Sequence, residues 1–218
     1  MKTFCIIGLG RFGQTLALTL VRNGHQVMVI DANAEAVNLL SDVVTNAIIG
    51  DPTSESVLRA SGVKNYDCAV VCVSDNINDS ILITLLLKDL NVPKVVVRAT
   101  SDLHKRVLEK IGADLVVFPE QDMGEKLAYM LEKTNVMEYI EFSAEYSIVE
   151  IKIPSSWLGK TIIELDVRKR YGLTIIAVSD EVQGSVDISP DPSRVFQAGE
   201  SVTVMGANKS IERLIKHM

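Results

Sequence analysis

The sequence lacks several features that would each indicate a particular class of protein. Only 5% of its 218 residues are aromatic, so Leu and β-branched side chains must supply most of the core. It has no basic run and a net charge of −6, which argues against a nucleic-acid partner. Its longest uncharged apolar run, 81–87, is too short to cross a bilayer. A glycine motif begins within ten residues of Met1 and leaves no room for a signal peptide, so we expect a cytoplasmic protein.

Cysteine and histidine are also scarce. The three cysteines, Cys5, Cys68 and Cys72, fall in apolar segments, and no Cys/His spacing resembles that of a metal site. We therefore expect them to pack in the core of a protein from a reducing compartment, the alternative being a metal or redox role. The histidines do not form a catalytic set, and we expect all three on the surface; they are His25, His104 and His217.

A glycine motif is the most informative feature that is present. Gly8, Gly10 and Gly13 follow an apolar segment, 3–7, and open a helix-like segment, 12–22, which is the strand–turn–helix context of a G-x-G-x-x-G loop. The first glycine permits a tight turn, the second admits a phosphate, and the third lets the helix pack on the strand. The start of the helix offers N–H groups to an anion. We predict a nucleotide-binding site, the alternative being a purely structural turn.

An acidic residue after the next strand supports this prediction. Asp31 follows segment 26–30 and lies 18 residues after Gly13, close to the spacing at which a carboxylate binds ribose hydroxyls. Its charge would repel a 2′-phosphate, which favours an adenosine or NAD-type ligand over NADP. The alternative is that Asp31 caps the following helix.

Strand-like and helix-like segments alternate up to about residue 134. Right-handed crossovers then give an α/β fold with a doubly wound, Rossmann-like parallel sheet in the strand order 3-2-1-4-5-6. The carboxyl ends of its strands would line one crevice. We expect strands at 3–7, 26–30, 46–49, 68–73, 94–99 and 115–118, and helices at 12–22, 34–40, 54–61, 77–90, 102–111 and 121–132.

The pattern changes after Thr134. We predict a nucleotide-binding domain over 1–134 and a small α+β domain over 135–218. The second domain alone would have a thin core, which favours pairing with another copy. Its expected strands are 138–143, 147–153, 173–179 and 202–205, its helices are 162–171 and 210–217, and a hydrophilic loop covers 180–194.

The chain resembles, from end to end, the regulatory subunits of bacterial potassium transporters of the Ktr/Trk type. These carry an N-terminal RCK (regulator of potassium conductance) domain and a smaller C-terminal RCK domain, and the arrangement looks most like the Ktr branch. The matching segments are GLGRFG (8–13), VID (29–31), GDPT (50–53), KIGAD (110–114), PEQDMG (119–124), LDVR (165–168) and YGLTI (171–175), with Pro190, Pro192, Gly199 and Glu200.

The resemblance implies a function that composition does not reveal. Such proteins are not enzymes; they form dimers and octameric rings docked on the cytoplasmic face of an integral-membrane potassium transporter subunit. ATP favours the active ring and ADP the inactive one, and the change in ring shape gates the transporter. NAD(H) occupies the same cleft in some relatives, and the C-terminal domains of several bind cyclic di-AMP at their dimer interface.

The candidate nucleotide-binding residues combine the crevice residues with those that the resemblance implies. By resemblance, Arg11 reaches a terminal phosphate and Glu120 contributes to a Mg²⁺ or Ca²⁺ site between the nucleotides of paired subunits. The alternatives are a solvated Arg11 and a Glu120 that complements a helix dipole. Asp51 would equally cap a helix, and Arg98 would pair with Glu120 or a phosphate. The full set is Gly8, Gly10, Arg11, Phe12, Gly13, Asp31, Ala32, Asn33, Asp51, Thr53, Val73, Ser74, Arg98 and Glu120.

A second candidate set lies in the C-terminal domain. An apolar wall suits adenine and an arginine suits phosphate, which fits the cyclic di-AMP implied by the resemblance; the alternative is the core of a dimer. These residues are Ile162, Ile163, Asp166, Arg168, Thr174, Ile175, Ile176 and Pro190.

Two other functions compete with a nucleotide-sensing regulatory subunit. One is a small NAD-dependent oxidoreductase, for which the sequence offers no histidine or tyrosine at a strand end. The other is a ligand-sensing module of another channel or an antiporter. We expect the chain to be the nucleotide-sensing regulatory subunit of a membrane potassium transporter.

Overall fold

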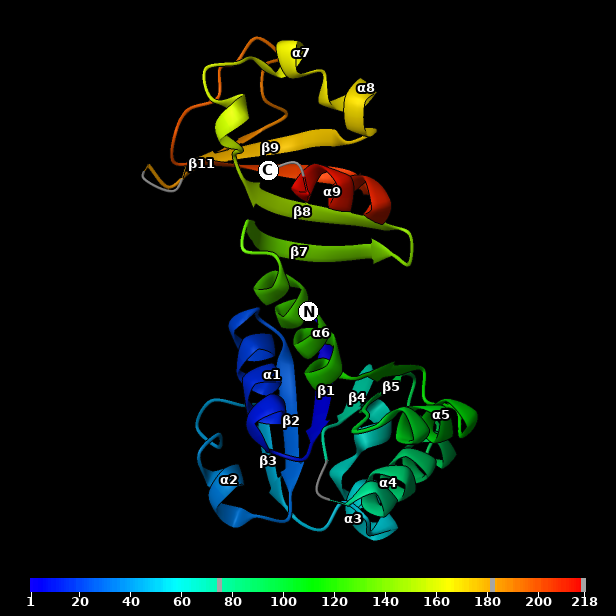
Figure 1. The fold of residues 1–218 in the computed structure, drawn as a ribbon. Coiled ribbons are helices and arrows are strands. Elements are labelled where there is room, and N and C mark those ends of the chain that lie inside the picture. Colours follow the sequence, from blue (N-terminus) through cyan, green and yellow to red (C-terminus); the bar gives the residue numbers. More distant parts are fainter. Residues whose placement is uncertain (74–75, 181–182, 217–218) are drawn as a thin grey trace. The chain divides into compact units, whose positions relative to one another are not determined.

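A computed structural model describes residues 1–73, 76–180 and 183–216 of the chain. These residues divide into two compact units, Met1–Gln121 and Asp122–Met218, each with its own sheet (Figure 1). The domain division predicted from the sequence, after residue 134, stays a prediction. Among the described residues, no helix combines the length and the apolar character needed to cross a bilayer.

The first unit is the predicted parallel sheet. Its six strands are ordered β3-β2-β1-β4-β5-β6, which confirms the predicted order. Strand β4 ends at Val71, two residues before the predicted end. The elements are β1 (Thr3–Ile7), α1 (Arg11–Arg22), β2 (Gln26–Asp31), α2 (Ala34–Asn38), β3 (Asn46–Ile49), α3 (Glu55–Ser61), η1 (Val63–Asn65), β4 (Cys68–Val71), α4 (Ile77–Asp89), β5 (Val95–Arg98), α5 (Asp102–Lys110), β6 (Leu115–Val117) and α6 (Pro119–Glu132), the last of which continues into the second unit.

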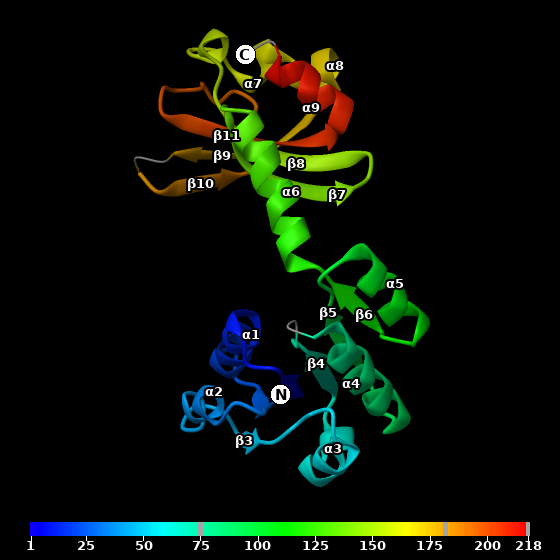
Figure 2. The same ribbon diagram turned by 60° about the horizontal axis from the view of Figure 1, so that its bottom comes forward.

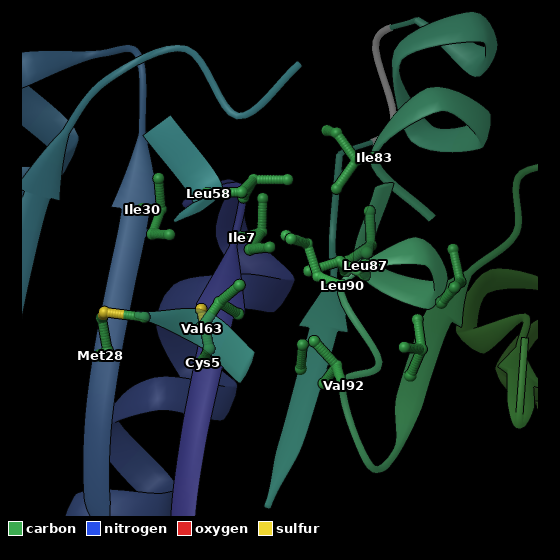
Figure 3. Close-up of a cluster of buried hydrophobic side chains, with 14 of the residues drawn as sticks. Cys5, Ile7, Met28, Ile30, Leu58, Val63, Ile83, Leu87, Leu90 and Val92 are labelled. Carbon is green, nitrogen blue, oxygen red and sulfur yellow. The ribbon is translucent and has the colours of Figure 1, made fainter. Parts of the chain in front are cut away.

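Both faces of this sheet are covered, which explains why its strands are continuously apolar. Side chains alternate along a strand, so Cys5 and Ile7 of β1 lie on one face and Ile6 on the other. The first face packs against α3, α4 and α5, and Figure 3 shows Leu58 and Leu87 from two of these helices in that cluster. The second face packs against α1 and α2. The three cysteines are buried and free, as predicted.

The second unit is built on an antiparallel sheet with the order β10-β9-β11-β8-β7 (Figure 2). One core cluster, with Trp157 and Phe196, joins this sheet to α7, α8 and α9. This confirms the predicted separate small domain of the α+β class. The elements are β7 (Val136–Ser143), β8 (Tyr146–Lys152), η2 (Ser155–Trp157), α7 (Ile162–Leu165), α8 (Val167–Tyr171), β9 (Thr174–Asp180), β10 (Ser185–Ile188), β11 (Glu200–Ala207) and α9 (Asn208–Ile215).

Two predictions for the second unit were wrong. The segment 180–194 is not a loop throughout, because β10 pairs antiparallel with β9 within it. The single helix expected over 162–171 is two short helices, since Asp166 has a φ of 44° and interrupts the helical hydrogen bonding between them.

The prediction that every histidine is at the surface was also wrong for His104. This residue is 2% exposed, and its Nε2 finds no partner among the described residues. Burial lowers the pKa of its imidazole, because the charged form would lose its hydration. His25 is partly exposed, and His217 lies outside the described residues.

Candidate functional site

A cavity of about 230 Å³ opens at the carboxyl ends of the central strands of the first unit. Open parallel sheets bind ligands at this edge, where the strand order reverses. The walls come from the glycine loop, the ends of β2 and β3, the residues after β4, and the start of α4. The lining residues are Gly8, Leu9, Gly10, Asp31, Ala32, Asp51, Pro52, Thr53, Cys72, Val73, Asp79 and Ile83.

The three glycines of the loop meet different surroundings. A Cβ on Gly8 would lie 2.9 Å from the backbone nitrogen of Val73, and one on Gly13 would lie 2.0 Å from the carbonyl oxygen of Gly8. A Cβ on Gly10 would meet no atom within 4 Å. Gly8 and Gly13 therefore permit close packing of the turn and the helix, whereas Gly10 keeps open space next to the cavity.

The start of α1 is suited to an anion. Gly10 is its N-cap residue and supplies no side-chain acceptor, and no acidic residue lies in the first turn. The first N–H groups of a helix have no acceptor within the helix, and they stand at the positive end of its dipole. Arg11, the first residue of α1, is exposed and adds a positive charge, although it does not line the cavity. These features fit a phosphate group.

Asp31 already binds the loop. Its Oδ2 accepts the N–H of Leu9, and its Oδ1 accepts the N–H of Asn33 at 2.8 Å. The cap of α2 is Asn33, whose Oδ1 accepts the N–H groups of Glu35 and Ala36. The alternative that Asp31 caps this helix is therefore wrong. Each carboxylate oxygen can accept a further hydrogen bond, which keeps Asp31 able to bind ribose hydroxyls.

Asp51 forms a local turn after β3. Its Oδ1 accepts the backbone N–H of Thr53 at 2.9 Å and the Thr53 hydroxyl at 2.7 Å. The hydroxyl and then the backbone hydrogen bond lower the pKa of the Asp51 carboxyl, so it is charged at neutral pH. The N-cap residue of α3 is Ser54, not Asp51.

Arg98 and Glu120 form an ion pair outside the cavity lining. The Arg98 side chain is only 15% exposed, and its guanidinium carbon lies 5.7 Å from the centre of the Phe12 ring. Burial opposes ionisation of Glu120, but the hydrogen bond and charge of Arg98 outweigh it and lower the pKa of the carboxyl. Of the two interpretations left open for Arg98, this chain shows the pairing with Glu120.

The described residues of this one chain do not supply a cation site. No group of three or more His, Cys, Asp or Glu side chains among them is arranged around a common point for a metal. Glu120 is occupied by Arg98. The predicted Mg²⁺ or Ca²⁺ site involves a paired subunit, so it stays a prediction.

The cavity brings together about half of the predicted nucleotide-binding set. Ser74 lies outside the described residues. Sequence reasoning missed Asp79 and Ile83, although α4 follows β4 and its first two turns therefore face the same crevice. The predicted residues that line the cavity are Gly8, Gly10, Asp31, Ala32, Asp51, Thr53 and Val73, and those that do not are Arg11, Phe12, Gly13, Asn33, Arg98 and Glu120.

A second cavity, of about 640 Å³, lies in the second unit. It is lined by all of the residues predicted for a second ligand except Ile176. Asp166, between α7 and α8, and Arg168 of α8 line it together with Thr174 of β9. Ser189 and Pro192 complete the wall near Pro190. Among the described residues, its lining combines apolar side chains with the guanidinium of Arg168 and the carboxylate of Asp166, and the binding of a second ligand here stays a prediction.

Comparison with known families gives a match over both units. The model of the TrkA-N domain matches residues 4–119, and that of the TrkA-C domain matches residues 147–218. The chain is 42% identical over 212 residues to the Ktr system potassium uptake protein A of Bacillus subtilis, covering 97% of this chain and 95% of the relative. It is 40% identical over 217 residues to the Ktr system potassium uptake protein C of the same organism, covering 100% and 97%.

Solved structures give the same fold. The RCK domain of GsuK superposes with a TM-score of 0.56 at 25% identity; the match covers all of this chain and 47% of the GsuK chain, so this chain spans about half of that one. A GsuK structure bound to ADP matches with a TM-score of 0.54 at 27% identity, over 61% of this chain and 34% of that one.

Proposed function

The chain belongs to the family of TrkA-N/TrkA-C proteins and is a KtrA-like RCK subunit, and from this we propose that it regulates a membrane potassium transporter by sensing an adenine nucleotide. The nucleotide is ATP or ADP, with NAD(H) as a second ligand of the same cleft. The protein acts as a homo-oligomer, a ring of eight built from dimers, at the cytoplasmic face of the membrane. The transporter is a separate polypeptide.

One observation carries the nucleotide proposal. The uncapped start of α1, with open space beside Gly10, lies next to a carboxylate, Asp31, in one cavity. Exposed amides suit phosphates and a carboxylate suits a ribose diol, so the arrangement matches two adjacent parts of a nucleotide. The ADP-bound structure of GsuK, a protein with the same fold, supports this choice.

The proposed mechanism is a shift between ring shapes. A ligand moves a conformational equilibrium only by its difference in affinity for the two states. ATP and ADP differ by one terminal phosphate, and Arg11 at the start of α1 is the side chain that we assign to that group. A guanidinium can form two parallel hydrogen bonds with a phosphate, which gives the difference in affinity a physical basis.

The cavity is poorly equipped for redox catalysis. Among its described lining residues there is no His, Tyr or Lys that would supply a proton near a nicotinamide. The oxidoreductase alternative is therefore not supported by this site.

For the second cavity we propose cyclic di-AMP as the ligand, because its apolar wall and Arg168 suit an adenine and a phosphate.

The first prediction concerns Arg11. Titration calorimetry of the purified protein with ATP, ADP and NADH should show binding of adenine nucleotides without their consumption. Arg11→Ala should weaken ATP binding about tenfold and ADP binding much less, because a charge-assisted hydrogen bond to the terminal phosphate is lost. Arg22→Ala, at the other end of α1, is the matched control and should change neither affinity.

Three results would contradict this proposal. The first is native protein that binds none of the three nucleotides at millimolar concentration, and the second is steady oxidation of NADH. Equal loss of ATP and ADP affinity in Arg11→Ala would contradict the assignment of Arg11 to the terminal phosphate.

The regulatory role is tested by growth at limiting potassium of a bacterium that keeps the partner transporter but lacks this chain. The native gene should restore growth of this strain.

A further inference from the structure

A group of exposed cations gathers where α8 packs against α9. The two helices share one core cluster through Val167 and Leu214, and Figure 2 shows them side by side. Arg213 of α9 joins them directly, because its Nη2 donates to the carbonyl oxygens of Arg170 and Tyr171 at 3.2 and 3.0 Å. The exposed cations of this surface, which we call the basic patch, are Lys169, Arg170, Lys209, Arg213 and Lys216.

The spacing of the cations on α9 places them on one face of the helix. Lys209, Arg213 and Lys216 are four and three residues apart, so they form one stripe along the helix surface. Ile211 and Leu214, which fall outside this stripe, are buried in the core. Helix α9 is therefore amphipathic, with a cationic stripe on its solvent side that meets the end of α8.

Little within the described part of the chain offsets this charge. Apart from Arg213, no member of the basic patch forms an ion pair with a described residue. Lys209 lies in the first turn of α9, at the positive end of the helix dipole, and four residues before Arg213; both arrangements are unfavourable for a cation. The chain as a whole is acidic, with 28 acidic and 22 basic residues. A local conflict of this kind is typical of a functional surface.

The basic patch offers charge without an apolar anchor. Its five cations outnumber the acidic residues beside α9, which are Glu212 and Glu145. In the described part of α8 and α9 no large apolar side chain is exposed, because these side chains pack in the core. A protein partner usually supplies aromatic or apolar anchors that need a pocket. An anionic lipid surface instead attracts clusters of about four to eight Lys and Arg side chains through charge. The chemistry of the patch therefore fits lipid headgroups.

We propose that the basic patch binds the anionic headgroups of the cytoplasmic leaflet of the membrane. This rests on the membrane location in the proposed function and adds to it a direct contact with lipid, separate from the contact with the transporter. Because α9 keeps its apolar side chains in the core, it lies on the headgroups and does not insert between the acyl chains. Binding is consequently reversible and weakens as salt screens the charges.

The test is co-sedimentation of the purified protein with lipid vesicles. Vesicles of phosphatidylcholine alone are compared with vesicles of equal parts phosphatidylcholine and phosphatidylglycerol, which is anionic. Native protein should bind only the anionic vesicles, and 1 M salt should abolish binding, because the screening length falls to about 3 Å. The triple variant Lys169→Gln/Lys209→Gln/Lys216→Gln should bind about a hundredfold more weakly, the loss expected for three cations near a charged bilayer.

Two controls separate the patch from general effects. The triple variant Lys64→Gln/Lys105→Gln/Lys110→Gln removes the same charge from exposed lysines of the first unit and should keep the native affinity for vesicles. Arg213 stays in place in both variants, because it holds the end of α8. Lys209→Gln alone should keep or raise the melting temperature, since it removes a cation from an unfavourable position.

The outcomes keep this inference apart from the function beneath it. Native protein that does not bind anionic vesicles at low salt would overturn the inference, as would equal losses in the two triple variants or native-strength binding to phosphatidylcholine alone. Displacement from the vesicles by duplex DNA at equal phosphate concentration would show a general polyanion surface and overturn the assignment to lipid. Titration calorimetry with ATP is run on the same samples. Nucleotide binding without vesicle binding overturns the inference alone, whereas vesicle binding without nucleotide binding contradicts the proposed function.

Discussion

Gly13, whose side chain is a single hydrogen atom, allows α1 to pack closely against the turn at Gly8. Alanine is normally the better helix former by about 1 kcal/mol. At this position its Cβ would lie 2.0 Å from the carbonyl oxygen of Gly8, a backbone atom that cannot rotate away. Packing therefore overrides helix propensity here. Gly10 differs, because its φ of −65° suits any residue and its Cβ would meet open space.

These two glycines lead to opposite predictions. Gly13→Ala should lower the free energy of unfolding by about 1–3 kcal/mol, the usual cost of overpacking. Gly10→Ala should change it by less than about 0.5 kcal/mol, as surface substitutions do, but should weaken ATP binding by filling the space next to the exposed amides. Urea denaturation followed by circular dichroism, together with calorimetry, measures both. Equal stability of the two variants would show that α1 can move away from the turn.

Several contacts at the site lay beyond sequence reasoning. The spacing of Asp31 predicted a ribose ligand, but nothing in the sequence indicated that its carboxylate binds the amide of Leu9. The ion pair of Arg98 with Glu120 was one of two open alternatives, because a sequence does not say which charge a guanidinium reaches first. The motif thus located the cavity, whereas the hydrogen bonds that orient its side chains needed coordinates.

At the scale of elements, strands that are buried on both faces were predictable and an exposed edge strand was not. Strands β1, β2, β4 and β5 are largely continuous apolar runs, and their order follows from the handedness of the crossovers. Strand β10 has four exposed residues, alternates polar with apolar side chains and is only four residues long. Alternation over only four residues is the shortest that indicates a strand, and the polar segment around it, with Pro190 and Pro192, favoured a loop.

The break between α7 and α8 was missed because it depends on one backbone angle. Asp166 has a φ of 44°, a conformation that costs an ordinary L-residue about 1–2 kcal/mol and that Asp and Asn tolerate best after Gly. Residues on both sides are helical, so the local pattern is continuous. The two short helices bring Leu165 and Val167 into the same core.

This angle can be tested by substitution. Asp166→Gly should leave the second unit at least as stable as the native one, whereas Asp166→Val should destabilise it by about 1–2 kcal/mol. Arg168→Gly is the comparison, because glycine inside a helix costs about 1 kcal/mol. Fluorescence of Trp157 during urea denaturation reports this unit. Greater stability of the valine variant than of the glycine variant would mean that the backbone does not hold this angle.

At the scale of the whole molecule, the chain carries two separate hydrophobic cores. The clusters of the first unit and the cluster around Trp157 share no residue. Trp157 is the single tryptophan of the sequence, so its fluorescence follows the second unit alone. Proteins with two cores often unfold in more than one step, and a ligand stabilises directly the part that holds its site.

ATP should therefore stabilise the two units unequally. At a concentration 100 times its dissociation constant, a ligand adds about 2.7 kcal/mol to the stability of its binding unit. Hydrogen exchange of the amides in β1, β2 and β3 should slow accordingly, while the urea midpoint reported by Trp157 should stay within error. If the Trp157 midpoint rises by the full amount, the two units unfold as one.

Under the proposed function, the hydrogen bonds of Asp31 bear on how quickly the protein responds to its nucleotide. Because this carboxylate already fixes the amides of Leu9 and Asn33, an arriving nucleotide need not order the glycine loop and loses no affinity to that step. Binding then requires no prior ordering of the loop. When the nucleotide concentration falls, the fraction of protein with bound nucleotide falls at the dissociation rate of the nucleotide. Under the proposed function, a glycine loop that is preorganised by the carboxylate assigned to the ribose is suited to report a falling ATP level promptly.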